Sequence, residues 1–212
     1  MKKYLLSFGL LVACALNANA GIEYGVTAGY NLTSMKLDRS TLTSTIQGKN
    51  GSGWYIGPKV NIDLIMGLSL EAAGVYNQRE YKFANVAGVS LTETAKSLDF
   101  PINAKFTFPV AAVGVYVSTG PQFSFALGNK EFSLSNLFSA KNGYFKRENL
   151  TTTWNVGAGV RLMKHLEVGL SYNMPLGKTG SAVLNTVGVP QGHTEVPEYK
   201  ANTFSVQASY YF

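Results

Sequence analysis

Histidine, the side chain best suited to general acid–base catalysis near neutral pH, occurs at only two positions in the chain, His165 and His193. A hydrolase acting on membrane lipid would need one of them within hydrogen-bond reach of a serine, with an acid behind it. His193 stands beside Thr194 and Glu195, in a polar segment that we interpret as a flexible loop with no rigid strand beneath it. His165 falls in a predicted short turn. We therefore predict that the chain has no catalytic site and is not an enzyme.

The sequence offers equally little for a metal ion or a cofactor. Zinc sites are built from clustered cysteines and histidines, whereas this chain has a single cysteine, Cys14, and two distant histidines. The acidic residues of the predicted loops lack the spacing of a calcium-binding loop. Gly157, Ala158 and Gly159 lie inside a predicted strand, where small residues ease curvature, and do not form a dinucleotide-binding turn. No metal, cofactor or nucleotide site is predicted.

Charged residues instead recur singly, between apolar residues, through most of the chain. The 18 Lys and Arg against 12 Asp and Glu give a formal net charge of +6, without the basic cluster that would indicate a nucleic-acid partner. Arg79 is one of these isolated charges. The network that we predict on one shared polar face comprises Glu23, Lys59, Asp63, Glu71, Asp99, Lys105, Arg161 and Glu167.

The elements that position these charges are predicted by an alternation of apolar and polar residues. In residues 203–212 every even-numbered position is apolar or aromatic, and the odd positions are Thr, Ser, Gln, Ser and Tyr. Side chains of a strand point alternately to opposite faces, so one face of each such segment is apolar and the other polar. Each segment is long enough to cross a bilayer as a tilted strand of about 9–11 residues. The segments are residues 22–33, 54–65, 68–82, 97–108, 112–127, 152–162, 166–176 and 203–212.

Lipid provides no hydrogen-bond partners for the main chain, so strands can cross it only as a closed barrel. We therefore predict an all-β fold, an eight-stranded antiparallel transmembrane up-and-down β-barrel. An interior of eight strands is just wide enough to be filled by side chains, so the predicted charges should pair there and block the lumen. A soluble barrel of the lipocalin type, with its apolar residues inside, is the structural alternative. Charges balanced in sign and aromatic residues near the strand ends favour the membrane barrel.

Long and short connections alternate along the predicted barrel. Outer-membrane barrels pair short periplasmic turns with long extracellular loops. We therefore expect an integral protein of the bacterial outer membrane, with both ends of the mature chain in the periplasm and His165 on the side away from lipid A. The predicted turns are residues 66–67, 109–111 and 163–165, and the predicted loops are residues 38–53, 83–94, 128–150 (with a short helix at 135–141) and 177–200.

The N-terminus has the pattern of an export signal. Lys2 and Lys3 precede an apolar run, residues 4–16, and Ala18-Asn19-Ala20 forms a small-residue cleavage site. We expect residues 1–20 to be a secretory signal peptide and residues 21–212 to be the barrel domain. Removal of both lysines lowers the net charge from +6 to +4. The alternative is acylation of Cys14 within Leu11-Val12-Ala13-Cys14, a lipoprotein-like sequence.

Three short motifs stand out in the predicted strands: the Pro-containing strand Leu98-Asp99-Phe100-Pro101-Ile102-Asn103-Ala104-Lys105-Phe106, Gly120-Pro121, and Gly157-Ala158-Gly159-Val160. They resemble the strands of the Bacteroidetes outer-membrane β-barrel (PorT-like porin) family of Gram-negative bacteria. The likeness extends over residues 21–212. Tyr210 and Phe212, in the terminal Tyr-Tyr-Phe, look like the signal that barrel-assembly machinery recognises. The family includes a component of a protein-secretion system and many proteins without a defined role, so the resemblance implies location and fold more than activity.

Aromatic and basic residues of the longest predicted loop are the best sequence indication of a binding surface. They would contact lipopolysaccharide phosphates or a protein partner, although packing of the loop on itself is the simpler interpretation. We expect a non-catalytic role in membrane structure, surface interaction or a secretion assembly, surrounded by outer-membrane lipid. The alternatives are a narrow pore for small solutes and a lipid-modifying enzyme that would use His193. The loop residues are Phe132, Phe138, Lys141, Tyr144, Phe145, Lys146 and Arg147.

Overall fold

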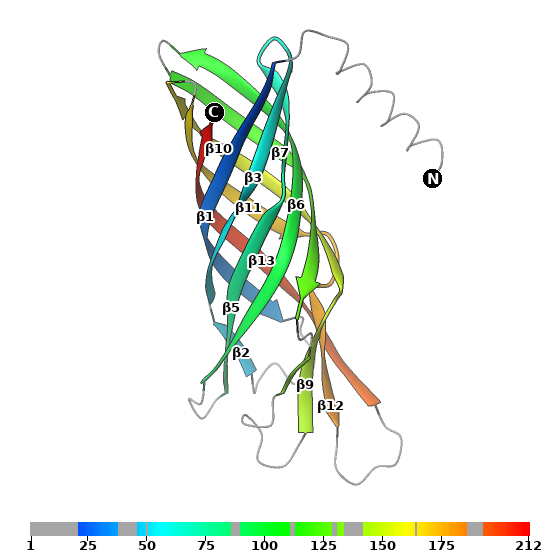
Figure 1. Ribbon diagram of the computed structural model, residues 1–212. Helices are drawn as coiled ribbons and strands as arrows, with labels where there is room; N and C mark the ends of the chain where they lie inside the picture. The colour runs from blue at the N-terminus through cyan, green and yellow to red at the C-terminus, as the bar shows by residue number, and fades with distance from the viewer. Residues whose placement is uncertain are drawn as a thin grey trace, which may run out of the picture.

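The computed structural model shows a closed antiparallel β-barrel of eight wall strands, as predicted (Figure 1). Among the residues that it describes, no helix is both long and apolar enough to cross a membrane. Residues 1–20, which contain the predicted signal peptide and Cys14, lie outside these residues. The structure describes residues 21–37, 46–49, 51–85, 90–110, 113–128, 131–133, 142–163, 165–185 and 193–212.

Each wall strand pairs with the strands on either side of it, and the first strand closes the barrel by pairing with the last. β1 pairs with β3 from Ile22↔Ile62 and with β13 from Gly25↔Tyr211. β4 and β5 form one wall strand, because Gly74, which separates them, still donates its N–H to Pro58 O at 3.1 Å. The wall strands are β1 (Ile22–Leu37), β3 (Gly51–Ile65), β4 (Leu68–Ala73) with β5 (Val75–Asn85), β6 (Ser90–Val110), β7 (Val113–Leu127), β10 (Leu150–Leu162), β11 (Leu166–Pro175) and β13 (His193–Tyr211).

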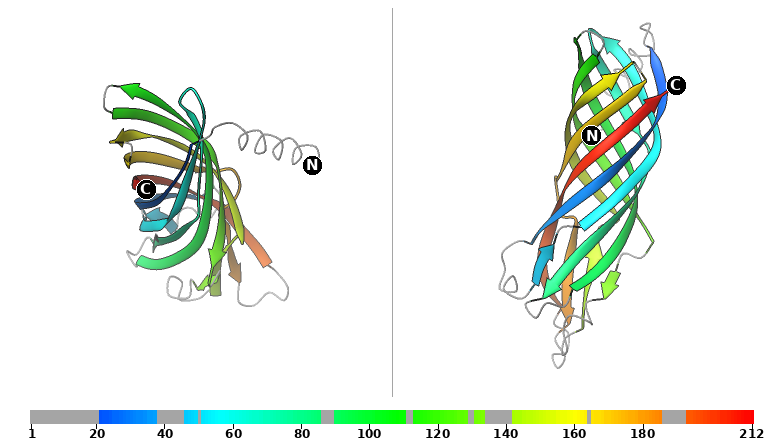
Figure 2. Two further views of the ribbon diagram at one scale, coloured as in Figure 1. Left: turned by 45° about the horizontal axis from the view of Figure 1, so that its top comes forward. Right: turned by 90° about the vertical axis from the view of Figure 1, so that its left-hand side faces the viewer.

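The two ends of the barrel differ. At one end, which we call the short-turn end, the chain reverses through tight turns such as Met66-Gly67, where both residues have positive φ (50° and 83°). At the other, the long-strand end, four short strands prolong the sheet, and β2, β9 and β12 lie at the bottom of Figure 1. Figure 2 shows the wall strands running obliquely around the barrel. The short strands are β2 (Ile46–Lys49), β8 (Glu131–Ser133), β9 (Asn142–Arg147) and β12 (Gly180–Asn185).

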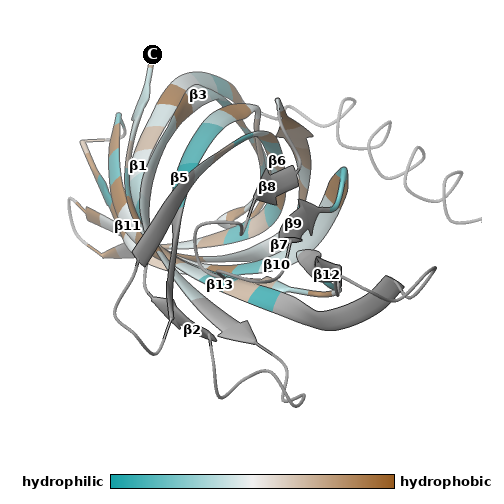
Figure 3. Ribbon diagram, turned by 90° about the horizontal axis from the view of Figure 1, so that it is seen from below, coloured by the Kyte–Doolittle hydropathy of each residue, from teal (hydrophilic) through white to brown (hydrophobic). Residues whose placement is uncertain are grey.

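Apolar side chains face outward and polar side chains face the lumen, which contradicts the lipocalin-type alternative. Tyr24 is 64% exposed and Ile56 53% exposed, whereas Asn61 and Lys105 are fully buried. Viewed along the axis, hydrophilic and hydrophobic residues alternate along the wall strands (Figure 3). In β1 the outward apolar residues run from Ile22 to Leu32. Ten steps of about 3.3 Å, tilted by about 40°, give a band about 25 Å tall, which matches the hydrocarbon span of outer-membrane barrels.

Aromatic residues ring this band near the long-strand end. Tyr30 lies beside Trp54 on the neighbouring strand, and the Trp54 and Tyr76 ring centroids are 5.7 Å apart. The outward-facing Trp154 does not leave its indole N–H unpaired in lipid, because it donates to Thr119 Oγ1 at 2.9 Å. Amphipathic rings of this kind are typical of membrane interfaces.

The predicted loops are shorter in the structure, because the strands continue beyond the apolar band. β5 ends at Asn85 and β6 begins at Ser90, so most of predicted loop 83–94 is strand. Predicted loops 38–53, 128–150 and 177–200 likewise contain strand residues, and predicted turn 109–111 begins within β6. Water surrounds strands beyond the band on their outer face, so the apolar alternation that predicts a strand fades there. The predicted helix at 135–141 lies outside the described residues.

Close approach of neighbouring strands at Gly120 generates a testable prediction. A Cβ at Gly120 would collide with the carbonyl oxygen of Ile102 and lie 2.8 Å from Asn103 Cα, both main-chain atoms of β6. We expect Gly120→Ala to lower the free energy of unfolding by about 1–3 kcal/mol through overpacking. Urea unfolding in detergent micelles, followed by heat-dependent gel mobility, measures this change. Gly177→Ala is the control, because a Cβ there meets no atom within 4 Å; equal effects at both positions would contradict the prediction.

Candidate functional site

Four charged side chains from four strands meet across the lumen in the half nearer the short-turn end. Lys59 on β3 lies 2.8 Å from Glu71 on β4 and 3.3 Å from Glu167 on β11. Lys105 on β6 lies 3.2 Å from Glu71 and 2.8 Å from Glu167. The charges therefore alternate in sign around a four-membered ring, and each cation contacts both anions. The four side chains are at most 8% exposed.

Tyr211, on β13, completes this group, which we call the lumen cluster: Lys59, Glu71, Lys105, Glu167 and Tyr211. The Tyr211 hydroxyl donates to Glu167 Oε2 at 3.2 Å and accepts from Lys105 Nζ at 3.4 Å. The Lys59 and Lys105 ammonium groups lie 5.6 and 5.4 Å from the centroid of its ring. Buried charges are tolerated where they are paired and hydrogen-bonded, and here each charge has several partners.

A second ion pair lies at the short-turn end of the lumen. Arg161 Nη2 approaches Glu23 Oε1 at 2.6 Å, and Asn61 Nδ2 donates to Glu23 Oε2 at 3.0 Å. Asn61 also donates to Asp63 Oδ1 at 2.8 Å. Asp63 is exposed at the rim of the barrel, because it lies two residues from the end of β3. It is therefore not brought into the lumen cluster.

Two tyrosines occupy the middle of the lumen. Tyr116 is 1% exposed and lies against Gly159 and Gly169, since a Cβ at either glycine would overlap its ring or hydroxyl. Tyr55 lies against Gly29 in the same way, and its hydroxyl donates to Gln207 Oε1 at 2.9 Å. Inward-facing glycines thus leave the space that these rings fill.

Asp99 lies apart from the lumen cluster, in the half nearer the long-strand end. Its Oδ2 accepts from Arg79 Nη2 at 3.0 Å, from Asn77 Nδ2 at 2.7 Å and from Gln122 Nε2 at 3.1 Å. Asp99 is 1% exposed. The structure therefore divides seven of the eight charges of the predicted network into three groups: Lys59, Glu71, Lys105 and Glu167 in the cluster, Glu23 and Arg161 beside it, and Asp99, which pairs with Arg79, beyond the tyrosines. Asp63 alone stands at the rim.

Tyr55 and Tyr116 were not singled out by the sequence analysis. Their parity within each strand was the available signal, because both positions alternate in register with inward residues such as Lys59 and Ser118. Which glycines they contact depends on the pairing register between strands, as in Gly29↔Tyr55 and Gly159↔Tyr116. An aromatic residue at an inward position opposite a glycine is thus an indication of lumen packing.

The structure corrects the interpretation of His193. It is the first residue of β13 and pairs with Asn185 of β12, so a strand does lie beneath it. His165 lies at the short-turn end, where its Nδ1 is 3.0 Å from Tyr211 O and its ring stacks on Tyr210. Within the described ranges, no group of three or more His, Cys, Asp and Glu side chains is arranged to hold a metal ion.

The predicted assembly signal lies at the end of β13, with Phe212 one residue past it, and the described part of the predicted loop surface lies on β8 and β9. Tyr210 and Phe212 point outward, 49% and 77% exposed, with ring centroids 5.9 Å apart. Phe132 of β8 pairs with Phe145 of β9. Phe138 and Lys141, from the same predicted surface, lie outside the described residues.

A closed barrel with an apolar outer band and a polar, filled lumen defines a transmembrane β-barrel. Residues 5–212 match the family model described as outer membrane protein beta-barrel domain, and the chain belongs to that family. This membership supports a location in the bacterial outer membrane. A comparison with curated proteins found no match.

The chain is similar to several solved outer-membrane proteins at low sequence identity. The outer membrane protein OprG of Pseudomonas aeruginosa is 12% identical, with a TM-score of 0.54 over 91% of this chain and 96% of that one. A major outer membrane protein of Thermus thermophilus is 12% identical, with a TM-score of 0.48 over 91% and 100% of the two chains. Neisserial surface protein A is 15% identical, with a TM-score of 0.48 over 91% and 99%. The likeness to OprG is one of fold alone.

Removal of one member of the lumen cluster should destabilise the barrel strongly. We expect Lys105→Met to lower the free energy of unfolding by about 3–5 kcal/mol, because it leaves Glu71 and Glu167 undercompensated. The double variant Lys105→Met with Glu167→Gln should lose less free energy of unfolding than the two single variants lose in sum, since the two residues interact directly. Urea unfolding in micelles gives all three values.

The control for this cycle is the exposed pair of Lys178 and Glu148, 3.7 Å apart with side chains 46% and 39% exposed. Lys178→Met should change the free energy of unfolding by at most about 1 kcal/mol, as for other surface ion pairs. Additive effects of Lys105→Met and Glu167→Gln would contradict a coupled lumen cluster.

Proposed function

We propose that the protein is an integral, non-catalytic barrel of the outer membrane whose lumen is closed by its own side chains. Its role lies in membrane structure, surface interaction or a secretion assembly. The observation that carries this proposal is the lumen cluster, in which two lysines and two glutamates from four strands contact one another at 2.8–3.3 Å. An ion crossing the lumen would have to separate these buried pairs, at a cost of several kcal/mol.

The arrangement of the two ends supports an orientation in the membrane. Short turns are typical of the periplasmic side of outer-membrane barrels, and longer structures of the outer side. We therefore place the short-turn end, with Gly21 and Phe212, in the periplasm, and the long-strand end outside. Residues 1–20 then act as the export signal that is cleaved after Ala20.

The proposed partners follow from this orientation. The apolar band contacts membrane lipid, and the strands at the long-strand end contact lipopolysaccharide or a protein partner. Tyr210 and Phe212, at the exposed end of β13, are recognised by barrel-assembly machinery. The Pro-containing motif around Pro101 lies in β6, and we assign the chain to the PorT-like branch found in Bacteroidetes because of it.

The second candidate function is a narrow pore for small solutes. A cavity of about 60 Å³ lies in the lumen toward the long-strand end, lined mainly by polar residues. It favours solute entry as far as the lumen cluster. A lipid-modifying enzyme is the weaker alternative, and unchanged lipid composition in cells that carry His193→Ala would remove it.

Conductance distinguishes the closed barrel from the pore. Purified wild-type protein in planar bilayers should give no steady single-channel current. The double variant Lys105→Ala with Glu167→Ala removes one charge of each sign from the lumen cluster, and current should then appear because the lumen widens without a net charge. Lys178→Ala with Glu148→Ala is the matched control and should stay silent. Steady current through the wild-type protein would favour the pore.

Accessibility in intact cells tests the orientation. A short epitope inserted between Gly177 and Lys178, at the long-strand end, should bind antibody on whole cells. The same epitope inserted between Met66 and Gly67 should bind only after the outer membrane is permeabilised. Heat-dependent gel mobility checks that both insertions fold. The reverse pattern of labelling would contradict the orientation while leaving the closed lumen unaffected.

A further inference from the structure

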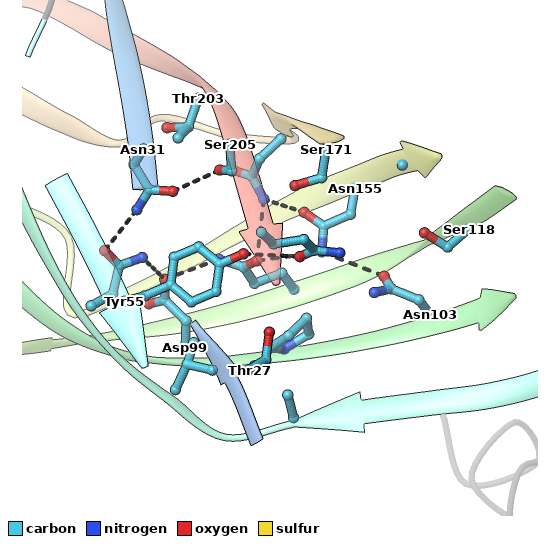
Figure 4. Close-up of a pocket in the computed structure, with 18 of the residues that line it drawn as sticks. Thr27, Asn31, Tyr55, Asp99, Asn103, Ser118, Asn155, Ser171, Thr203 and Ser205 are labelled. Atoms are coloured by element: carbon cyan, nitrogen blue, oxygen red, sulfur yellow. Dashed lines mark hydrogen bonds between the residues drawn. The ribbon is translucent and has the colours of Figure 1, made fainter. Parts of the chain in front are cut away.

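The cavity toward the long-strand end is bounded by a ring of amide and hydroxyl side chains that converge on one carboxylate. Ser205 Oγ donates to Asn31 Oδ1 at 2.6 Å, and Asn31 Nδ2 donates to Asn77 Oδ1 at 3.0 Å (Figure 4). Asn77 Nδ2 then donates to Asp99 Oδ2 at 2.7 Å. From the other side, Asn155 Nδ2 donates to Gln122 Oε1 at 3.3 Å, and Gln122 donates to the same Asp99 oxygen. Both chains of hydrogen bonds therefore end on Asp99 Oδ2.

The second oxygen of this carboxylate is left without a donor. Asp99 Oδ1 is buried and accepts no hydrogen bond from any residue that the structure describes, while Asp99 itself lines the cavity. An ionised carboxylate has room for about four hydrogen bonds and strongly favours having both oxygens occupied. The ring thus fixes Asp99 in place beside the cavity and leaves Oδ1 with unused capacity to accept a hydrogen bond.

The charge balance of the cavity indicates that this group is neutral. Its charged lining residues are Lys59 with Glu71, 2.8 Å apart, and Arg79 with Asp99, 3.0 Å apart. Each acid is already paired with a base, so a bound ion would bring a charge without a partner into a buried site. A neutral ligand with hydroxyl groups avoids this cost, because a hydroxyl both donates and accepts.

The remaining lining fits such a ligand. Thr27, Ser118 and Ser171 add hydroxyls, and Ala73 and Gly157 leave the space open. The volume of about 60 Å³ exceeds the roughly 10–15 Å³ that a cavity needs to hold one water, so it accepts the end of a larger molecule. Lys59 and Glu71 of the lumen cluster line the same cavity, so a ligand enters from the long-strand end.

We propose that this cavity binds the hydroxymethyl or diol end of a neutral polyol or saccharide, with Asp99 Oδ1 accepting a hydroxyl hydrogen. The ligand approaches from outside the cell if the orientation proposed above holds. Binding by the purified protein does not depend on that orientation or on whether the barrel conducts, so this site and the proposed function fail independently.

The test is a titration of the purified barrel in detergent micelles, followed by amide chemical shifts of Asn31, Asn77 and Gln122. The probes are glycerol, glucose, a soluble glucose oligosaccharide and ammonium chloride. We expect saturable shifts with the hydroxyl-bearing probes and none with ammonium. Tighter binding of the oligosaccharide than of glucose would indicate that the site binds the ends of saccharide chains. The reverse order would indicate that it binds free small molecules. Either order supports the proposal.

Two variants and a control complete the experiment. Asp99→Asn should weaken binding by about tenfold or more, because a charged acceptor becomes neutral. Ala73→Leu should abolish binding by filling the cavity while every hydrogen-bonding group stays, and it decides the question if Asp99→Asn does not fold. Asp63→Asn, the same change at the opposite rim, should bind as the wild type. The proposal is wrong if no hydroxyl-bearing probe gives saturable shifts or if only ammonium does. It is also wrong if folded Asp99→Asn and Ala73→Leu proteins bind as the wild type.

Discussion

Main-chain N–H and C=O groups within the apolar band must find their partners on neighbouring strands, because hydrocarbon offers none. The pairing of β1 with both β3 and β13 meets this requirement by closing the sheet. Closure also separates two environments, since period-two alternation sends every second side chain into an enclosed lumen. Polar groups confined there have little access to water and must pair with one another. The ring of Lys59, Glu71, Lys105 and Glu167 is therefore a consequence of closure as well as a feature of the site.

The lumen cluster also specifies how the strands align. Its members come from β3, β4, β6 and β11, and Lys59 and Glu167 are 108 residues apart in the chain. A slip of one residue between two wall strands would turn a charged side chain toward lipid and break its pairs. Lipid-facing residues alone specify which face is outside but little about register, because one apolar side chain can replace another there. The buried charges supply the more exacting constraint.

The inside and outside of the barrel could be predicted from sequence because alternation within the apolar band is nearly complete, as in residues 203–212. The inward positions of Glu71 and Glu167 followed from that parity. Their partners did not, because contacts across the lumen depend on the tilt and stagger of strands far apart in the chain. Asp63 has the same parity and yet stands at the rim. The extensions around Asn85 and His193 were missed because neither face of a strand beyond the membrane must be apolar.

These extensions change what the protein presents to its surroundings. Leu98 is an outward apolar residue of the band, and β6 begins eight residues earlier, at Ser90. Eight strand residues at the same tilt rise about 20 Å, so the wall continues well past the hydrocarbon. A molecule held at the tip is thereby kept at a fixed stand-off from the lipid headgroups, by paired strands and not by a flexible tether. Geometry of this kind suits recognition of bulky objects that cannot approach the membrane surface.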